Sequence, residues 1–177
     1  MKIVVITGSA HKNGTSAYLA TKFIEGATAS GHEVFRFDAA FKNVHPCLGC
    51  DHCHNSDSEC VFKDDMTELN PKLLAADVVV FASPIYYYDV NAQIKAVIDR
   101  FYANDEALHG GKKAAILLTM ADETTESAEG ALGSFKGMTN FLGWETAGTV
   151  VGVNCWTLDM LKETDYPKQA YELGRAL

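Results

Sequence analysis

The chain has 177 residues, which is enough for one α/β domain with a buried core and not comfortably enough for two. Hydrophobic residues make up 47% of it and charged residues 21%, a balance that excludes a wholly disordered chain. The net charge of -8 argues against a nucleic-acid surface or an anionic membrane as the main partner.

Five segments rich in β-branched and aromatic residues are predicted to be strands. In chain order they cover residues 2–7, 33–38, 77–82, 113–119 and 144–153. Several are almost continuously apolar, which is typical of strands that are buried on both faces of a parallel sheet.

Helical patterns are predicted between these strands and after the last one. They cover residues 16–29, 91–102, 124–142 and about 165–177. A further helix is expected to start after Asp64 and Asp65, and Pro71 is expected to kink it or to restart it after Asn70.

Alternation of strands and helices predicts right-handed βαβ units and a doubly wound parallel sheet. Five strands in such a sheet most often take the flavodoxin-like order 2-1-3-4-5, in which ligands bind at the carboxyl ends of strands 1 and 3. Because no repeat or linker interrupts the chain, we predict a single flavodoxin-like domain over residues 1–177, with a cysteine-rich loop at about 43–63.

The N-terminal apolar run is too short for a signal-peptide core, and no stretch reaches the roughly 18 apolar residues of a membrane span. The sequence therefore predicts a soluble, cytoplasmic protein without a membrane partner.

The segment 8–16 follows the first strand and combines glycines and hydroxyl side chains at the start of a helix. Hydroxyls of Ser9, Thr15 and Ser16 can donate to phosphate oxygens, and the helix N-terminus adds free N–H groups. The segment is neither a Walker A motif nor a G-x-G-x-x-G motif, so a monophosphate is favoured over a triphosphate or a dinucleotide. The alternative is a capped loop that binds no ligand.

The segment 82–89 follows the third strand and contains Tyr86, Tyr87 and Tyr88 in succession. A planar heteroaromatic ligand gains about 1 kcal/mol per aromatic pair from stacking, beyond simple burial. The alternative for these tyrosines is a dimer interface or packing against the core.

Taken together, the two loops resemble the NADPH-dependent FMN reductase and flavodoxin-like oxidoreductase family. In that family the first loop has approximately the pattern G-S-x-R-x-x-G-x-[ST], and the second has S-P-x-Y followed by K-x-x-x-D-R. The matching residues here are Gly8, Ser9, Gly14, Ser16, Ser83, Pro84, Ile85, Tyr86, Lys95, Asp99 and Arg100. The resemblance spans residues 1–153. His11 departs from the pattern, because a neutral histidine is a weaker phosphate partner than arginine.

The resemblance implies an FMN-dependent oxidoreductase that passes electrons from NAD(P)H through FMN to a small-molecule acceptor such as a quinone, a flavin or a nitro compound. It implies that FMN is held by Ser9, His11, Asn13, Thr15, Ser16, Pro84, Ile85, Tyr86, Tyr87, Thr119 and Met120. The flavin carries the chemistry in such a protein, so no catalytic side chain is expected. It also implies a homodimer or homotetramer. Lys95, Asp99 and Arg100 could have a functional role, or they could equally be part of a solvated helix face or an interface ion pair.

Four cysteines lie between the second strand and the next helix, with the spacing C-x2-C-x2-C-x6-C: Cys47, Cys50, Cys53 and Cys60. This spacing resembles iron–sulfur ligation, and in particular the iron–sulfur flavoproteins, a branch of the same family, so a [4Fe-4S] cluster is one interpretation. Zinc, bound by the four cysteines or with His52 or His54 recruited as a ligand, is a second one, and a metal-free loop is a third. Cys155 is predicted to be a buried thiol.

Two other classes of function stay open. A non-catalytic FMN electron carrier, with or without a cluster, would exchange electrons with a protein partner such as a ferredoxin, and the acidic surface suits a basic partner. A zinc-stabilised interaction module without flavin would be colourless.

Overall fold

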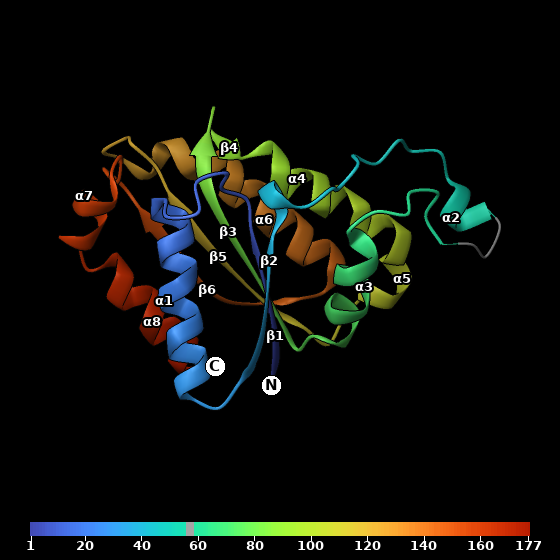
Figure 1. Ribbon diagram of the computed structural model, residues 1–177, viewed down its shortest axis with the longest axis horizontal. Coiled ribbons are helices and arrows are strands. Elements are labelled where there is room, and N and C mark those ends of the chain that lie inside the picture. The colour runs from blue at the N-terminus through green and yellow to red at the C-terminus, as the bar shows by residue number, and fades with distance from the viewer. Residues whose placement is uncertain (56–58) are drawn as a thin grey trace.

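The computed structural model describes residues 1–55 and 59–177 and contains one central parallel sheet (Figure 1). Its main strands follow the order β2-β1-β3-β5-β6. They are β1 (Lys2–Thr7), β2 (Glu33–Asp38), β3 (Val78–Tyr86), β5 (Lys113–Thr119) and β6 (Glu145–Gly152). The flavodoxin-like order predicted for five strands is confirmed.

The third strand is longer than predicted. It runs on to Tyr86, because its last two residues pair in an antiparallel hairpin with β4 (Asp89–Val90). Sequence periodicity did not predict β4, since a two-residue strand has no period to detect.

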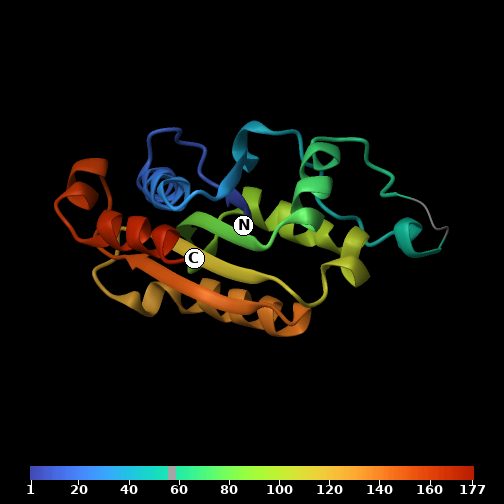
Figure 2. The ribbon, with the colours of Figure 1, turned by 90° about the horizontal axis from the view of Figure 1, so that it is seen from below.

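Helices cover both faces of the sheet, and Figure 2 shows α1 and α6 on opposite sides of it. One face packs against α1 (Thr15–Ala29), α7 (Leu158–Lys162) and α8 (Tyr166–Arg175). The other packs against α3 (Met66–Ala75), α4 (Ala92–Asp99) and α6 (Glu129–Leu142). Strand residues alternate between two apolar clusters, because successive side chains in a strand point to opposite faces.

Shorter helical segments complete the connections. They are η1 (Ala39–Phe41), α2 (His52–Asn55), η2 (Arg100–Asn104), α5 (Asp105–Leu108) and η3 (Thr125–Ala128). The predicted helix 91–102 thus divides into α4 and η2, and the pattern 124–142 divides into η3 and α6. Pro71 lies inside α3 without a restart, so that part of the prediction is wrong.

Two regions matter for function. The carboxyl ends of β1 and β3 lie at the same edge of the sheet, as parallel strands require (Figure 1). The cysteine-rich segment instead lies between η1 and α3 and reaches out to α2, on the side of the molecule away from α1 and α7 (Figure 1). No helix in the described ranges is long and apolar enough to cross a bilayer.

Candidate functional site

A hollow of about 440 Å³ opens at the carboxyl edge of the sheet, and we call it the rim hollow. It is lined by the loops that follow β1, β3, β5 and β6. Nine residues proposed from the sequence lie in its wall: Ser9, His11, Thr15, Ser16, Pro84, Ile85, Tyr86, Thr119 and Met120. Segments far apart in sequence therefore meet at one site. The hydroxyls of Thr15 and Thr119, 104 residues apart, are hydrogen-bonded there at 2.8 Å.

Two of the proposed residues do not line the rim hollow. Asn13 is one of them. Tyr87 is the other; it lines a neighbouring hollow of about 270 Å³, which shares Ile85 and Met120 with the first. Tyr87 sits in a hairpin turn with its side chain fully exposed, and its contact with the ring stays a prediction.

The N-terminus of α1 forms one end of the rim hollow. Gly14 occupies its N-cap position, and no side chain caps the helix. The hydroxyl of Ser16 is buried and has no hydrogen-bond partner among the described residues. Free N–H groups, the positive end of the helix dipole and an unpaired hydroxyl make this end suited to one phosphate group.

Another part of the lining is apolar and aromatic. Pro84, Ile85 and Tyr86 come from the end of β3, and Met120 follows β5. The backbone N–H of Met120 donates to the carbonyl of Gly152, which fixes the β5 loop against β6. A flat ring can pack against this wall while a phosphate bound to it reaches the N-terminus of α1.

Sequence reasoning missed three residues of the rim hollow: Cys155, Trp156 and Leu158. They follow β6, whose carboxyl end lies at the same edge of the sheet as those of β1 and β3, and this was the available signal. Cys155 is buried, as predicted, and burial raises the pKa of its thiol. Trp156 is 77% exposed and extends the aromatic wall.

The hairpin between β3 and β4 carries backbone strain. Tyr87 and Tyr88 have φ angles of 47° and 69°, the left-handed conformation that both central residues of a type I′ turn require. Side chains with a Cβ adopt it at a cost of about 1–2 kcal/mol per residue, and Asn-Gly is the usual pair.

We expect the double substitution Tyr87→Asn/Tyr88→Gly to raise the free energy of unfolding by about 1 kcal/mol, because it relieves this strain and removes exposed side chains. Urea denaturation measures the change. Tyr87→Phe keeps the strain and is the control, with no change expected. A lower stability of the double variant would show that the tyrosines are held by contacts rather than strained.

The four cysteines line a third, smaller hollow that is separate from the rim hollow. Burial raises the pKa of the Cys53 thiol, and the neighbouring thiols of Cys60, Cys47 and Cys50 raise it further. Within residues 1–55 and 59–177, however, no three Cys, His, Asp or Glu side chains are arranged to hold a metal ion. The four thiols lie around one hollow, but their arrangement is not that of metal ligands, so the metal stays a prediction.

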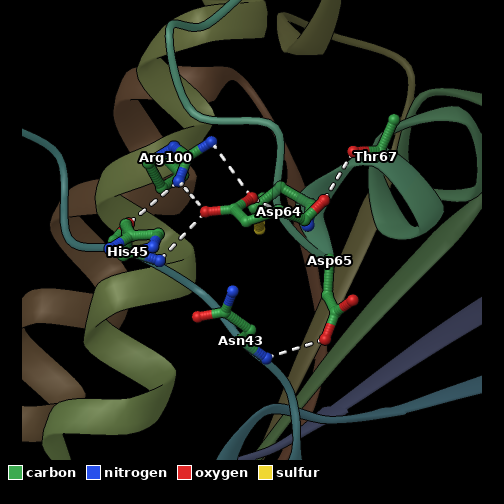
Figure 3. A network of polar contacts seen from close by, with 7 residues as sticks. Asn43, His45, Asp64, Asp65, Thr67 and Arg100 are labelled. Carbon is green, nitrogen blue, oxygen red and sulfur yellow. Dashed lines mark hydrogen bonds and ion pairs between the residues drawn. The ribbon is translucent and has the colours of Figure 1, made fainter.

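The base of the cysteine-rich segment is closed by a buried ion pair, which we call the loop clamp (Figure 3). Arg100 Nη1 lies 2.7 Å from Asp64 Oδ2 and donates to the carbonyl of His45 at 2.9 Å. The backbone N–H groups of His45 and Met66 donate to the same Asp64 carboxylate. Arg100, at the end of α4, therefore holds both ends of the segment.

Lys95, Asp99 and Arg100, which the sequence analysis treated as one group, have different environments in the structure. Lys95 and Asp99 form an exposed ion pair along α4, which matches the solvated-face interpretation. Arg100 is 3% exposed and belongs to the core.

Burial by itself raises the pKa of Asp64. Hydrogen bonds from Arg100, His45 and Met66 outweigh that effect, so this pKa lies below its ordinary value.

Comparison with known proteins decides the family. The model of the NADPH-dependent FMN reductase family matches residues 1–156, most of the chain. The chain belongs to this family. The FMN reductase family was the one inferred from the two loops that now line the rim hollow, so that inference is confirmed.

The relatives to which this chain is similar include iron-sulfur flavoproteins. One from Archaeoglobus fulgidus is 38% identical over 112 residues, which are 62% of this chain and 50% of the relative. One from Methanosarcina thermophila is 36% identical over 100 residues, which are 56% of this chain and 52% of the relative. The chain thus spans about half the length of these curated relatives.

The fold is shared more widely. The NAD(P)H:quinone oxidoreductase from Methanothermobacter marburgensis superimposes with a TM-score of 0.73 at 18% identity, over 98% of this chain and 94% of that one. At that identity the likeness shows the flavodoxin-like fold alone.

Proposed function

We propose that the chain binds FMN in the rim hollow and works as an NAD(P)H-dependent oxidoreductase for a quinone, flavin, nitro compound or similar acceptor. One observation carries the proposal: a single hollow combines an uncapped helix N-terminus with an apolar, aromatic lining from the end of β3, and the buried Ser16 hydroxyl beside it has no hydrogen-bond partner among the described residues. FMN has one phosphate and one flat ring, and membership in the FMN reductase family supports this match.

The roles of the chain's own residues follow from their places. The N–H groups of the first turn of α1, with the hydroxyls of Thr15 and Ser16, hold the phosphate. Pro84, Ile85 and Tyr86, which line the hollow, would pack against the ring. When bound, the isoalloxazine ring supplies the hydride- and electron-transfer chemistry, so these residues bind and orient rather than react.

A second flat molecule also has room. The neighbouring hollow, lined by Tyr87, Tyr88, Ala121 and Asp122, opens beside the rim hollow and shares its wall at Ile85. A nicotinamide or an acceptor placed there lies next to the ring, which supports turnover with a small substrate.

We expect Ser16→Ala to weaken FMN binding about tenfold and to leave riboflavin binding unchanged, because a hydrogen bond to a charged group contributes about 1.5–3 kcal/mol and riboflavin has no phosphate. Fluorescence titration with each flavin measures this. Ser30→Ala, at the other end of α1, is the matched control. Equal weakening of both flavins would place the phosphate elsewhere.

Turnover tests the enzymatic part. Purified protein loaded with FMN should oxidise NADH or NADPH with menadione as acceptor. If the flavin is not reduced by either nicotinamide, the dependence on NAD(P)H is wrong even where FMN binds.

The second candidate function is an electron carrier that exchanges electrons with a ferredoxin-like partner. Four thiols around one hollow favour it, since they equal the ligand number of one [4Fe-4S] cluster, and the similar proteins bear the name iron-sulfur flavoprotein. Broad absorption near 400 nm in anaerobically purified protein, bleached by dithionite and lost in Cys50→Ser, would support a cluster. The cytoplasmic location and the homodimer or homotetramer stay predictions.

A further inference from the structure

The side chain of Asn91 joins the two loops that form the rim hollow. Its Nδ2 donates a hydrogen bond to the carbonyl of Gly8, in the loop after β1. Its Oδ1 lies 3.2 Å from the hydroxyl of Ser83, near the end of β3, and its backbone N–H donates to that hydroxyl at 3.0 Å. One residue therefore contacts the base of the phosphate loop and the base of the ring wall.

This use of Asn91 is not the one that its position predicts. It occupies the N-cap of α4, where asparagine is among the best capping residues, yet its side chain makes no cap hydrogen bond. The amide is turned to Gly8 instead and is 2% exposed. Because the Asn91 side chain does not cap its own helix, its main contact is the one between the two loops.

Gly8 and Asn91 are tightly packed against each other. A Cβ atom on Gly8 would lie 2.0 Å from Asn91 Oδ1, so the backbone of the first loop approaches the amide as closely as glycine alone permits. The N–H of Gly8 donates to the carbonyl of Ala82 at 2.9 Å and adds a second link between the same two strand ends.

We propose that Asn91 is a positioning residue that fixes the distance between the phosphate-binding loop and the ring wall. A ligand with a phosphate and a flat ring then binds through both groups at the same time. The inference rests on the proposed function and deepens it. A rigid two-ended ligand gains from both contacts only where they stand at the right separation, and an error near 1 Å costs roughly 100-fold. A ligand that uses one end alone is indifferent to that separation.

The test compares three ligands on the full chain: FMN, riboflavin and inorganic phosphate. We expect Asn91→Ala and Asn91→Asp to weaken FMN about 100-fold and to change riboflavin and phosphate by less than about threefold. The aspartate variant keeps the shape and an equally good N-cap residue but places a carboxylate oxygen against the Gly8 carbonyl. Gln93→Ala, which removes the other partner of Asn91 Nδ2, is the matched control and should bind FMN as the wild type does.

The outcomes are distinct. A merely structural role for Asn91 loosens the loops themselves and weakens all three ligands together, which would overturn the inference while leaving the proposed function in place. Unchanged FMN affinity in both variants would overturn it as well. A wild-type chain that binds none of the three would overturn the proposed function and the inference with it. Circular dichroism and urea denaturation confirm that each variant is folded.

Discussion

Arg100→Leu is expected to lower the free energy of unfolding by about 3–5 kcal/mol, because it leaves the Asp64 carboxylate buried without its cation. Urea denaturation at neutral pH measures the loss. Lys95→Leu is the matched control on the same helix, since it breaks the exposed pair with Asp99 and should cost less than about 1 kcal/mol. Equal effects of the two substitutions would show that the loop clamp does not stabilise the fold.

The ion pair between Arg100 and Asp64 also makes the free energy of unfolding depend on pH in acid. The pKa of Asp64 lies below its ordinary value of 3.8, so the carboxylate's contribution to stability is complete above that value and is lost as the pH falls through the lower, folded pKa. In Arg100→Leu the buried carboxylate has lost its cation, so burial raises its pKa above the ordinary value. The stability gap to the wild type should therefore narrow as the pH falls through that raised pKa toward the lowered pKa of the wild type. A gap that widens in acid would contradict the assignment.

Removing both charges separates the energy of the ion pair from the cost of burying it. Arg100→Leu/Asp64→Leu should recover part of the loss, because no unpaired charge is left in the core. Recovery should be incomplete, because the backbone N–H groups of His45 and Met66 lose their acceptor.

Gly8→Ala is expected to weaken FMN binding by about 100-fold. Its Cβ would lie 2.0 Å from Oδ1 and 2.9 Å from Cγ of Asn91, and 3.1 Å from Cβ of Ile94. Asn91 cannot swing away, because it is buried and hydrogen-bonded on several sides, so the phosphate loop has to move. Fluorescence titration with FMN measures the effect.

Two further variants make this prediction specific. Gly133→Ala, on an open face of α6, should leave the FMN affinity unchanged. Gly8→Ala/Asn91→Ala should bind FMN no more weakly than the worse of the two single variants, because both substitutions break one link between the same loops. Additive losses would mean that Gly8 and Asn91 act independently.

Much of the framework could be predicted locally. Residues 2–7, 33–38 and 113–119 form strands with the predicted bounds, because apolar runs of this length fit a strand buried on both faces. The loop 8–16 was recognisable because glycine, hydroxyls and a following helix stand next to one another in the chain.

Other features had no local signal. Arg100 and Asp64 are 36 residues apart, and each looks like an ordinary surface charge in its own segment. Asn91 looks like an ordinary helix cap, and Trp156 like an isolated aromatic residue beyond the last strand.

The sequence by itself determined the alternation of strands and helices and the two loops that carry the family's motifs, because these depend on periodicity and on neighbours along the chain. Only the tertiary structure decided that Asn91 links those loops, that Arg100 closes the cysteine-rich segment and that Tyr87 lines the neighbouring hollow rather than the rim hollow. Such contacts depend on how strands stack side by side and on which rotamer the packed surroundings allow, and neither is written in the spacing of residues along the chain.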